Sequence, residues 1–165
     1  SPKTWTEERI AWEVQDRPKI GNENSVITVV PGITEGRLIG GKLNTIQGIF
    51  GTKYMPTINK NDILFIEDSM KSAAEIERSF SLLKCAGIFD KVSGVIYGKH
   101  ELFNDQNTNR KTYEILMEVI GKKNIPILAE FDCSHTHPMF TLPIGAKVYL
   151  DTANKIVKIL KEKIT

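Results

Sequence analysis

The stretch Asp62-Ile63-Leu64-Phe65-Ile66-Glu67-Asp68 decides the fold. Its four consecutive apolar residues are typical of a buried strand, which would place the carboxylate of Glu67 at the C-terminal end of that strand. Helix and strand patterns alternate on both sides of this segment. The sequence therefore predicts an α/β domain in which a carboxylate stands at the edge of the sheet.

Further strand and helix patterns extend along the chain. β-Branched and apolar runs predict strands at Ser25–Val30, Val92–Tyr97, Ile125–Ala129, Lys147–Leu150 and Ile156–Leu160. Helical spacing of apolar residues predicts a short segment at Thr6–Val14, a helix entered from a glycine-rich turn at Gly36–Thr45, and helices at Ala73–Leu83 and Tyr113–Ile120. The last two strands are joined by a tight turn, so the pattern favours a mixed sheet.

Length and composition exclude several classes of protein. The 165 residues fit one domain with a real core, and 41% hydrophobic and 25% charged residues are ordinary for a globular protein. A net charge of +2 gives no electrostatic case for a nucleic acid polymer, and no apolar run approaches the ~20 residues of a membrane span. The two cysteines form no CxxC pair, which favours a reducing, cytoplasmic setting. The chain begins without methionine, so we expect a processed chain or a piece of a longer one.

A second informative stretch, Glu130–Pro138, carries His135 and His137 in a polar loop between two predicted strands. A histidine on such a loop is well placed for general-base chemistry. A histidine and a strand-end carboxylate are two thirds of a hydrolytic triad. Glu67 has a second interpretation, as a surface carboxylate beside an Asp68 that caps the following helix.

The third member of a triad would be a nucleophilic serine. Such a serine normally lies in a strand-to-helix turn of the type G-x-S-x-G, and no such motif occurs in the sequence. From the residues alone, the chain is an α/β domain with an acid–histidine pair and no recognisable nucleophile.

Two other patterns have competing interpretations. The H-x-H pair would be half of a metal site, with His100, Asp132 or Cys133 as further ligands, but no ligand spacing supports it and we predict no metal. The glycines of residues 36–45 would bind phosphate through free backbone amides, yet their spacing fits no phosphate-binding motif. A tight turn with close backbone packing is the favoured interpretation there.

Three ordered motifs resemble the C-terminal domain of the LD-carboxypeptidase family of serine peptidases. They are Gly36–Thr45, Ile63–Asp68, and His135-Thr136-x-Pro138 followed by Thr141–Ala146. The lead-in Trp5–Glu13, with Arg17–Lys19, is similar to the microcin C self-immunity branch of that family. The resemblance covers essentially the whole chain.

This resemblance implies a swivelling β/β/α three-layer domain from a two-domain enzyme. Residues 1–24 would be the lead-in from an N-terminal domain that carries the serine nucleophile and the oxyanion hole. Glu67 would be the triad acid and His135 the general base. Asn44, Lys71 and Trp12 would contact the substrate, with Lys71 suited to an acidic group and Trp12 to a nucleobase. No cofactor is implied.

The resemblance also implies a substrate and leaves alternatives. The favoured one is the amide of a microcin C-like peptidyl-nucleotide, and the alternatives are murein tetrapeptide or a non-catalytic ligand-binding or dimerisation module. We expect a homodimer for the full-length protein. We also expect that the 165 residues fold alone but do not hydrolyse peptides, and that Glu67 and His135 lie within roughly 2.6–3.2 Å of each other. Ser134 departs from the glycine that the family usually has before the catalytic histidine.

Overall fold

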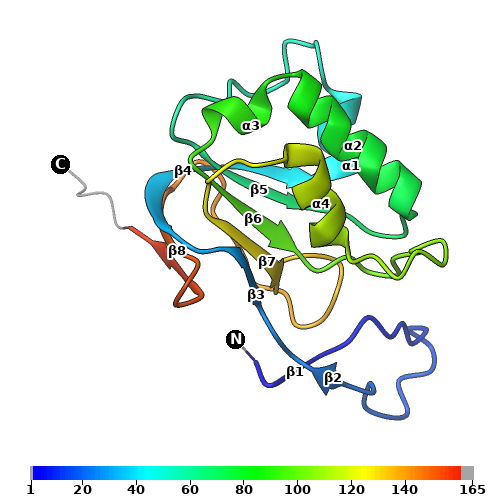
Figure 1. Cartoon of the computed structure of the whole chain (residues 1–165). Coiled ribbons are helices and arrows are strands. Elements are labelled where there is room, and N and C mark those ends of the chain that lie inside the picture. The colour runs from blue at the N-terminus through cyan, green and yellow to red at the C-terminus, as the bar shows by residue number, and fades with distance from the viewer. Residues whose placement is uncertain (1, 161–165) are drawn as a thin grey trace.

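The computed structural model describes residues 2–160, and a curled mixed sheet forms its centre (Figure 1). The strands of this sheet are β3 (Ile27–Val30), β4 (Ile33–Lys42), β5 (Ile63–Glu67), β6 (Gly94–Gly98), β7 (Ile127–Phe131), β8 (Lys147–Asp151) and β9 (Ile156–Ile159). Their order is β3-β7-β6-β5-β4-β8-β9. The four strands β4 to β7 run parallel to one another, whereas β3, β8 and β9 are antiparallel to their neighbours. The predicted mixed sheet is therefore confirmed.

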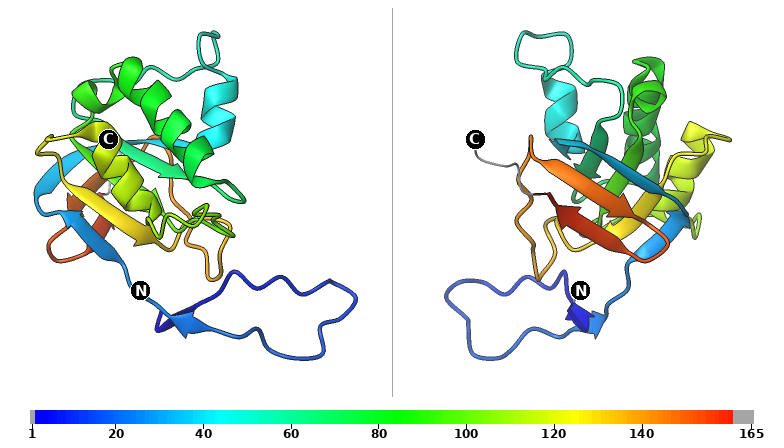
Figure 2. Two further views of the ribbon diagram at one scale, coloured as in Figure 1. Left: turned by 45° about the vertical axis from the view of Figure 1, so that its right-hand side comes forward. Right: turned by 90° about the vertical axis from the view of Figure 1, so that its left-hand side faces the viewer.

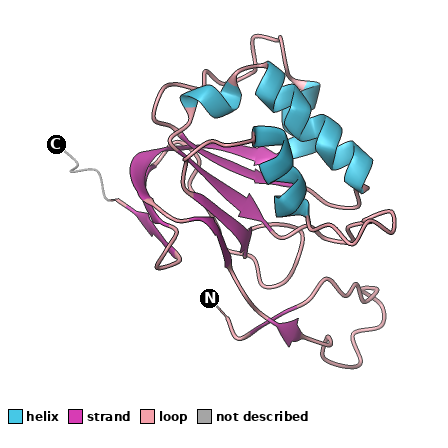
Figure 3. Ribbon diagram, in the orientation of Figure 1, coloured by secondary structure: helices cyan, strands magenta, loops and turns pink. Residues whose placement is uncertain are grey.

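Helices cover one face of the sheet (Figure 3). Those of the described residues are α1 (Leu43–Gly48), α2 (Ala73–Cys85), α3 (Ile88–Lys91) and α4 (Thr112–Ile120). The apolar stripe of α2 is buried against the sheet, as its spacing predicts. Ser72 and Glu75 cap α2 reciprocally through side chain and backbone, so the cap of this helix is Ser72 and not Asp68. Within residues 2–160, no helix is long and apolar enough to cross a membrane.

The sheet curls because β4 belongs to two layers (Figure 2). Its first half pairs with β8 and its second half pairs with β5. The helix-free face of the sheet thereby encloses a second apolar core. That core contains Val26, Leu38, Ile63, Phe65, Ile96, Leu128, Phe131, Val148 and Leu150. Helices, central sheet and the returning strands form the three-layer β/β/α arrangement that the resemblance implies.

Close approach between strands explains the glycines of β4. A Cβ at Gly36 would lie 2.1 Å from the carbonyl oxygen of Asn61, and a Cβ at Gly40 would lie 1.8 Å from that of Phe65. Gly40 also has a φ of +136°, which side-chain-bearing residues rarely adopt. The prediction of a tight turn at Gly36–Thr45 is therefore wrong, because most of this segment is strand.

Residues 2–24 form a long loop that extends from the body of the domain (Figure 2). Its ends pair as the short strands β1 (Thr4–Trp5) and β2 (Asn22–Glu23). Thr6 and His137 exchange two backbone hydrogen bonds of 2.8 Å, which fix the lead-in to the loop that follows β7. Asn24 donates to both carboxylate oxygens of Asp132 at 3.2 and 3.0 Å.

The predicted helical segment Thr6–Val14 is not helical. A helix of this length is marginal without packing, because nucleation costs more than a few hydrogen bonds return. Its side chains bind elsewhere instead. Arg9 forms a bidentate pair with Glu101, and Glu8 accepts hydrogen bonds from Arg17.

Candidate active site

Several polar side chains gather at the carboxyl edge of the parallel strands. Adjacent parallel strands end at the same edge of a sheet, so the residues that end them become neighbours. Here Lys42 ends β4, Glu67 ends β5 and Gly98 ends β6, while His135 lies in the loop after β7. The fold therefore places a lysine, a carboxylate and an imidazole together.

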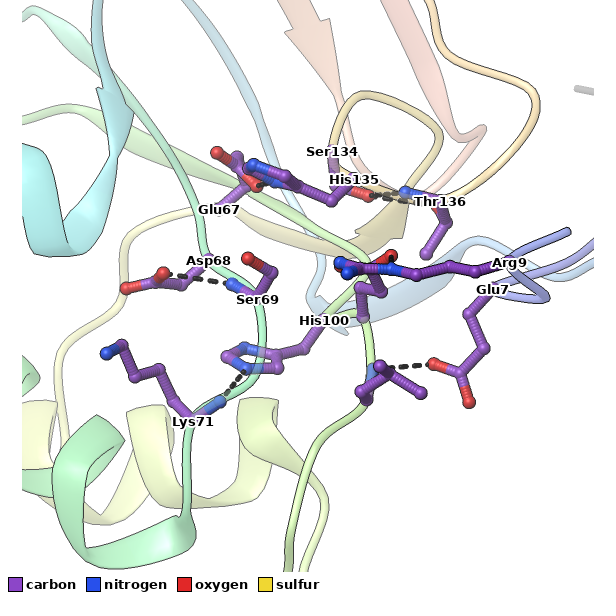
Figure 4. Close-up of polar contacts among 12 residues, drawn as sticks. Glu7, Arg9, Glu67, Asp68, Ser69, Lys71, His100, Ser134, His135 and Thr136 are labelled. Carbon is purple, nitrogen blue, oxygen red and sulfur yellow. Dashed lines mark hydrogen bonds and ion pairs between the residues drawn. The ribbon is translucent and has the colours of Figure 1, made fainter. Parts of the chain in front are cut away.

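Glu67 and His135 are joined by a direct hydrogen bond (Figure 4). Oε2 of Glu67 lies 2.8 Å from Nδ1 of His135, within the range expected from the sequence. An ionised carboxylate only accepts, so Nδ1 carries the proton and Nε2 keeps its lone pair. The Glu67 side chain is 9% exposed and that of His135 is 39% exposed, so the pair has a buried acid and an accessible base.

Burial affects the acid of this pair. It raises the pKa of the Glu67 carboxyl above its ordinary value, and the hydrogen bond from His135 opposes that rise only in part. The carboxylate form therefore depends on its cationic and hydrogen-bonding neighbours. A protonated Glu67 would no longer hold the imidazole in one tautomer.

The loop that carries His135 packs directly over the end of β6. A Cβ at Gly98 would lie 2.7 Å from the carbonyl oxygen of Cys133 and 2.9 Å from Cβ of Glu67. Gly98 therefore lets the loop approach Glu67. Within the loop, the hydroxyls of Ser134 and Thr136 are 2.9 Å apart and hydrogen-bonded. Ser134 has no positive φ, so the backbone at this position does not require glycine.

The three residues expected to contact substrate lie in different places. Asn44 stands in the first turn of α1, where its N–H donates to Asp68 at 2.9 Å. Lys71 follows β5, and its N–H donates to Nε2 of His100 at 3.2 Å. Asn44 and Lys71 therefore both lie in segments that directly follow the strands ending at the site, β4 and β5. Trp12 is 91% exposed and lines a separate hollow together with His137.

The alternative of a metal site gains no support from the geometry. The ring of His135 binds Glu67, and His137 lines the hollow near Trp12. Nε2 of His100 accepts the backbone N–H of Lys71, and Asp132 forms a 2.6 Å ion pair with Lys99 in which both side chains are at most 1% exposed. Among the described residues, no three His, Cys, Asp or Glu side chains come together in a way that would hold a metal ion.

An open hollow of about 350 Å³ lies over the acid–histidine pair. Its lining consists of Gly41, Lys42, Phe65, Glu67, Cys133, Ser134, His135, Met139 and Phe140. The serine in this lining, Ser134, is hydrogen-bonded to Thr136 and has no strand-to-helix turn around it. The hollow thus offers a base and an orienting acid to a reactant.

Sequence reasoning missed two residues that shape the site. Lys42 lies beside the imidazole, with Nζ 3.4 Å from Nε2 of His135. It follows Gly40, which fits β4 closely against β5, and the interpretation of this segment as a turn obscured that signal. Gly98 ends a strand, and a glycine in a strand often marks a close backbone approach.

Comparison with known proteins places the chain in a family. The family profile for the LD-carboxypeptidase C-terminal domain matches residues 35–150. The chain belongs to the LD-carboxypeptidase family. This is a family of serine peptidases, and the match includes β4, β5 and the histidine loop.

Relatives of this LD-carboxypeptidase domain include two named proteins. The microcin C7 self-immunity protein MccF of Escherichia coli is 50% identical over 166 residues, covering 99% of this chain and 48% of that protein. A Vibrio cholerae protein whose name classes it with the carboxypeptidases is 44% identical over 158 residues, covering 96% of this chain and 47% of that protein. The chain thus spans about half the length of the curated relatives it matches.

Solved structures of MccF share the fold of this domain. The structure in complex with aspartyl sulfamoyl adenosine has a TM-score of 0.93 and 50% identity, covering 98% of this chain and 49% of that one. A second MccF structure, also with a TM-score of 0.93, is described as an active-site mutant in which a serine, an asparagine and a lysine are each replaced by alanine.

Proposed function

We propose that this chain is the C-terminal half of a serine peptidase in which Glu67 and His135 are the acid and the base of a Ser-His-Glu triad. The observation that carries the proposal is the 2.8 Å hydrogen bond between a buried carboxylate and an accessible imidazole beside an open hollow. The serine and the oxyanion hole would come from a segment outside these 165 residues, such as the part of the relatives that the chain does not cover.

The chemistry follows the general logic of triads. Nε2 of His135 would take the proton of the serine as it attacks an amide carbonyl, and would then donate that proton to the leaving amine. Glu67 would hold the imidazole with its proton on Nδ1 and stabilise the imidazolium that forms. The exposure of the His135 side chain at the hollow is consistent with a nucleophile that arrives from another segment.

The proposed substrate is the amide between an acidic amino acid and a modified nucleotide. MccF, at 50% identity, has been solved with aspartyl sulfamoyl adenosine, which has this chemistry. The asparagine and lysine replaced in its active-site mutant are separated by the same number of residues as Asn44 and Lys71. These two residues would contact the aminoacyl part, and Trp12 would stack on the base. An LD-peptide of murein is the second candidate, favoured by the family name and by the carboxypeptidase relative.

The test uses the full-length protein that contains this chain. We expect it to release sulfamoyl adenosine from aspartyl sulfamoyl adenosine, measured by liquid chromatography, and we expect the Glu67→Gln and His135→Ala variants to lose most of that activity. Release of D-alanine from a murein tetrapeptide, with no nucleotide release, would favour the second candidate. Full activity of both variants would refute the triad.

A further inference from the structure

Lys42 is the charged residue nearest to the reactive side of the imidazole. It ends β4 in register with Glu67, which ends the parallel strand β5. The side chains of residues paired in this way point to the same face of a sheet. As a result, the ammonium of Lys42 lies at the hollow, 3.4 Å from Nε2 of His135.

The charge of Lys42 has no carboxylate partner among the described residues. Its ammonium donates to the hydroxyl of Ser69 at 3.2 Å, and no acidic oxygen in residues 2–160 forms an ion pair with it. The other lysines of this edge are paired, Lys71 with Glu75 and Lys99 with Asp132. A half-buried ammonium at a hollow, held by one hydroxyl and one imidazole nitrogen and by no anion, still has hydrogen-bonding capacity for an anion.

The place of this ammonium follows the geometry of the proposed reaction. Nδ1 donates its hydrogen bond to Glu67, so Nε2 is the atom that would deliver a proton to the leaving amine. To deliver that proton, Nε2 must come within about 3.2 Å of the leaving nitrogen. Nζ of Lys42 is 3.4 Å from Nε2, which puts it at most about 7 Å from the leaving nitrogen. An acidic group bonded to the leaving nitrogen, or one atom further on, is then within reach of the flexible lysine.

We propose that Lys42 is a specificity-determining residue that binds an acidic group carried by the leaving amine. The inference rests on the proposed function and adds a requirement on the leaving side of the scissile bond. A sulfamate, a phosphoramidate or the carboxylate of a terminal amino acid has this chemistry. When such a group binds, it replaces Nε2 as the neighbour of the ammonium, which frees the lone pair of Nε2 for the serine proton.

The test compares substrates that carry an acidic group on the leaving side with partners in which that group is absent or neutralised. One pair is aspartyl sulfamoyl adenosine and the aspartyl amide of 5′-amino-5′-deoxyadenosine. The other is a murein tetrapeptide and its C-terminal amide. The variants of the full-length protein are Lys42→Met, which removes the charge, and Lys42→Arg, which keeps it. Lys60→Met, at an exposed position in the loop before β5, controls for the loss of one surface charge.

We expect Lys42→Met to lower kcat/KM roughly 10- to 100-fold on the acidic member of the pair that the enzyme cleaves, the loss of one charge-assisted hydrogen bond. Its effect on the neutral member should be under about twofold, because no acidic group is present there to bind the ammonium. Lys42→Arg should keep most of the activity, and Lys60→Met should keep all of it. Which pair responds identifies the acidic group.

Two outcomes overturn the inference while the proposed function stands. An equal loss on both members of a pair would mean that Lys42 acts on His135 or on folding, and no loss on either would mean that it makes no contact with substrate. If the wild type cleaves neither pair, the proposed function itself fails. Calorimetry provides a readout that needs no turnover: Lys42→Met should weaken the binding of adenosine 5′-phosphoramidate, which is an anion, and leave that of adenosine unchanged.

Discussion

At the scale of single residues, the site depends on which atom of each imidazole is engaged. His135 uses Nδ1 for Glu67, and its Nε2 lies 3.4 Å from the ammonium of Lys42. His100 uses Nε2 to accept the Lys71 N–H, which leaves its buried Nδ1 without a hydrogen-bond partner. His137 contacts the lead-in through its backbone. The sequence shows three histidines, and the hydrogen bonds give each a different role.

Substitutions of His135 and His137 should have very different effects on kcat of the full-length protein. His135→Ala should lower kcat by roughly 10⁴- to 10⁶-fold, as the loss of a triad base does. His137→Ala should cost less than about tenfold, because its ring does not contact the acid–histidine pair. Steady-state rates on the same substrate measure both, and equal losses would instead point to a role shared by the two rings.

Glu67→Gln tests whether the carboxylate orients the imidazole of His135, because the substitution leaves the size of the side chain unchanged. The amide keeps the size of the side chain, but it cannot favour the proton on Nδ1 or stabilise the imidazolium. We expect kcat to fall about 10³- to 10⁴-fold, with a smaller change in KM. A circular dichroism spectrum and melting curve like those of the wild type would show that the loss is chemical. A fall in kcat of less than tenfold would remove Glu67 from the triad.

His100 should make the stability of the domain depend on pH. Burial lowers the pKa of His100 to about 4. As the pH falls from about 6.5 toward 4, the unfolded chain binds a proton that the folded chain does not, so the free energy of unfolding decreases. Between pH 7 and pH 5 the decrease should be about 2 kcal/mol, since one pKa unit corresponds to about 1.4 kcal/mol.

Urea unfolding at the two pH values measures this effect. His100→Gln, which keeps an acceptor near the position of Nε2, should flatten the dependence. His137→Gln, at an exposed histidine, should keep the slope of the wild type. An unchanged slope in His100→Gln would assign the pH dependence to other groups.

At the scale of elements, the sequence predicts most of the sheet and the position of Glu67. The apolar pattern predicts β5 and α2 correctly. The strand β5 is buried on both faces and is a continuous apolar run, whereas α2 is buried on one face and has apolar residues at helical spacing. The pattern fails at β4, because glycines near one another in sequence favour a turn. Here glycine is needed instead because two strands approach each other closely. The pattern also fails at Thr6–Val14, where contacts with distant residues such as Glu101 replace the helix.

Pairing between distant segments explains why the rest of the site could not be predicted. The proximity of Lys42 to His135 depends on the order β7-β6-β5-β4, which no local pattern contains. The position of the histidine loop depends on Gly98, which is distant from it in sequence. The residue roles came from the resemblance, whereas the distances came from the fold.

Gly98→Ala should damage the site more than the fold. Its Cβ would meet the backbone of Cys133 and Cβ of Glu67 at less than 3 Å, so the loop must move away. We expect the free energy of unfolding to fall by about 1–3 kcal/mol, which is typical of overpacking. We also expect kcat of the full-length protein to drop by at least about tenfold. Gly48→Ala is the matched control, because a Cβ there meets nothing within 4 Å. Wild-type turnover in Gly98→Ala would show that the loop does not need this close approach.

At the scale of the whole molecule, the acid–histidine edge is open while the apolar cores lie behind it. The two apolar clusters lie on opposite faces of one sheet. Exposed Met139, Phe140 and Ile144 lie in the segment that continues from the histidine loop. An active site that is complete only with a second domain fits this combination of buried cores and an open edge.

The 165-residue chain should therefore fold but not hydrolyse an amide. We expect a cooperative thermal transition and no release of sulfamoyl adenosine above the uncatalysed rate, because a general base alone contributes only ~10²–10⁴-fold. The remaining part of the full-length protein, supplied by fusion or as a separate chain, should restore turnover. A serine-dependent burst from the isolated chain would refute the split triad.

The exchange of backbone hydrogen bonds between Thr6 and His137 also bears on where this protein tolerates truncation. A chain trimmed to residues 35–150 would keep every residue of the family match and lose the lead-in, β3 and β9. It would expose the edge of β7 that β3 pairs, and an exposed strand edge promotes aggregation. It would also remove Asn24 from the buried Asp132, three residues before His135. The span that identifies the family is thus shorter than the span that we expect to stay in solution with the histidine loop intact.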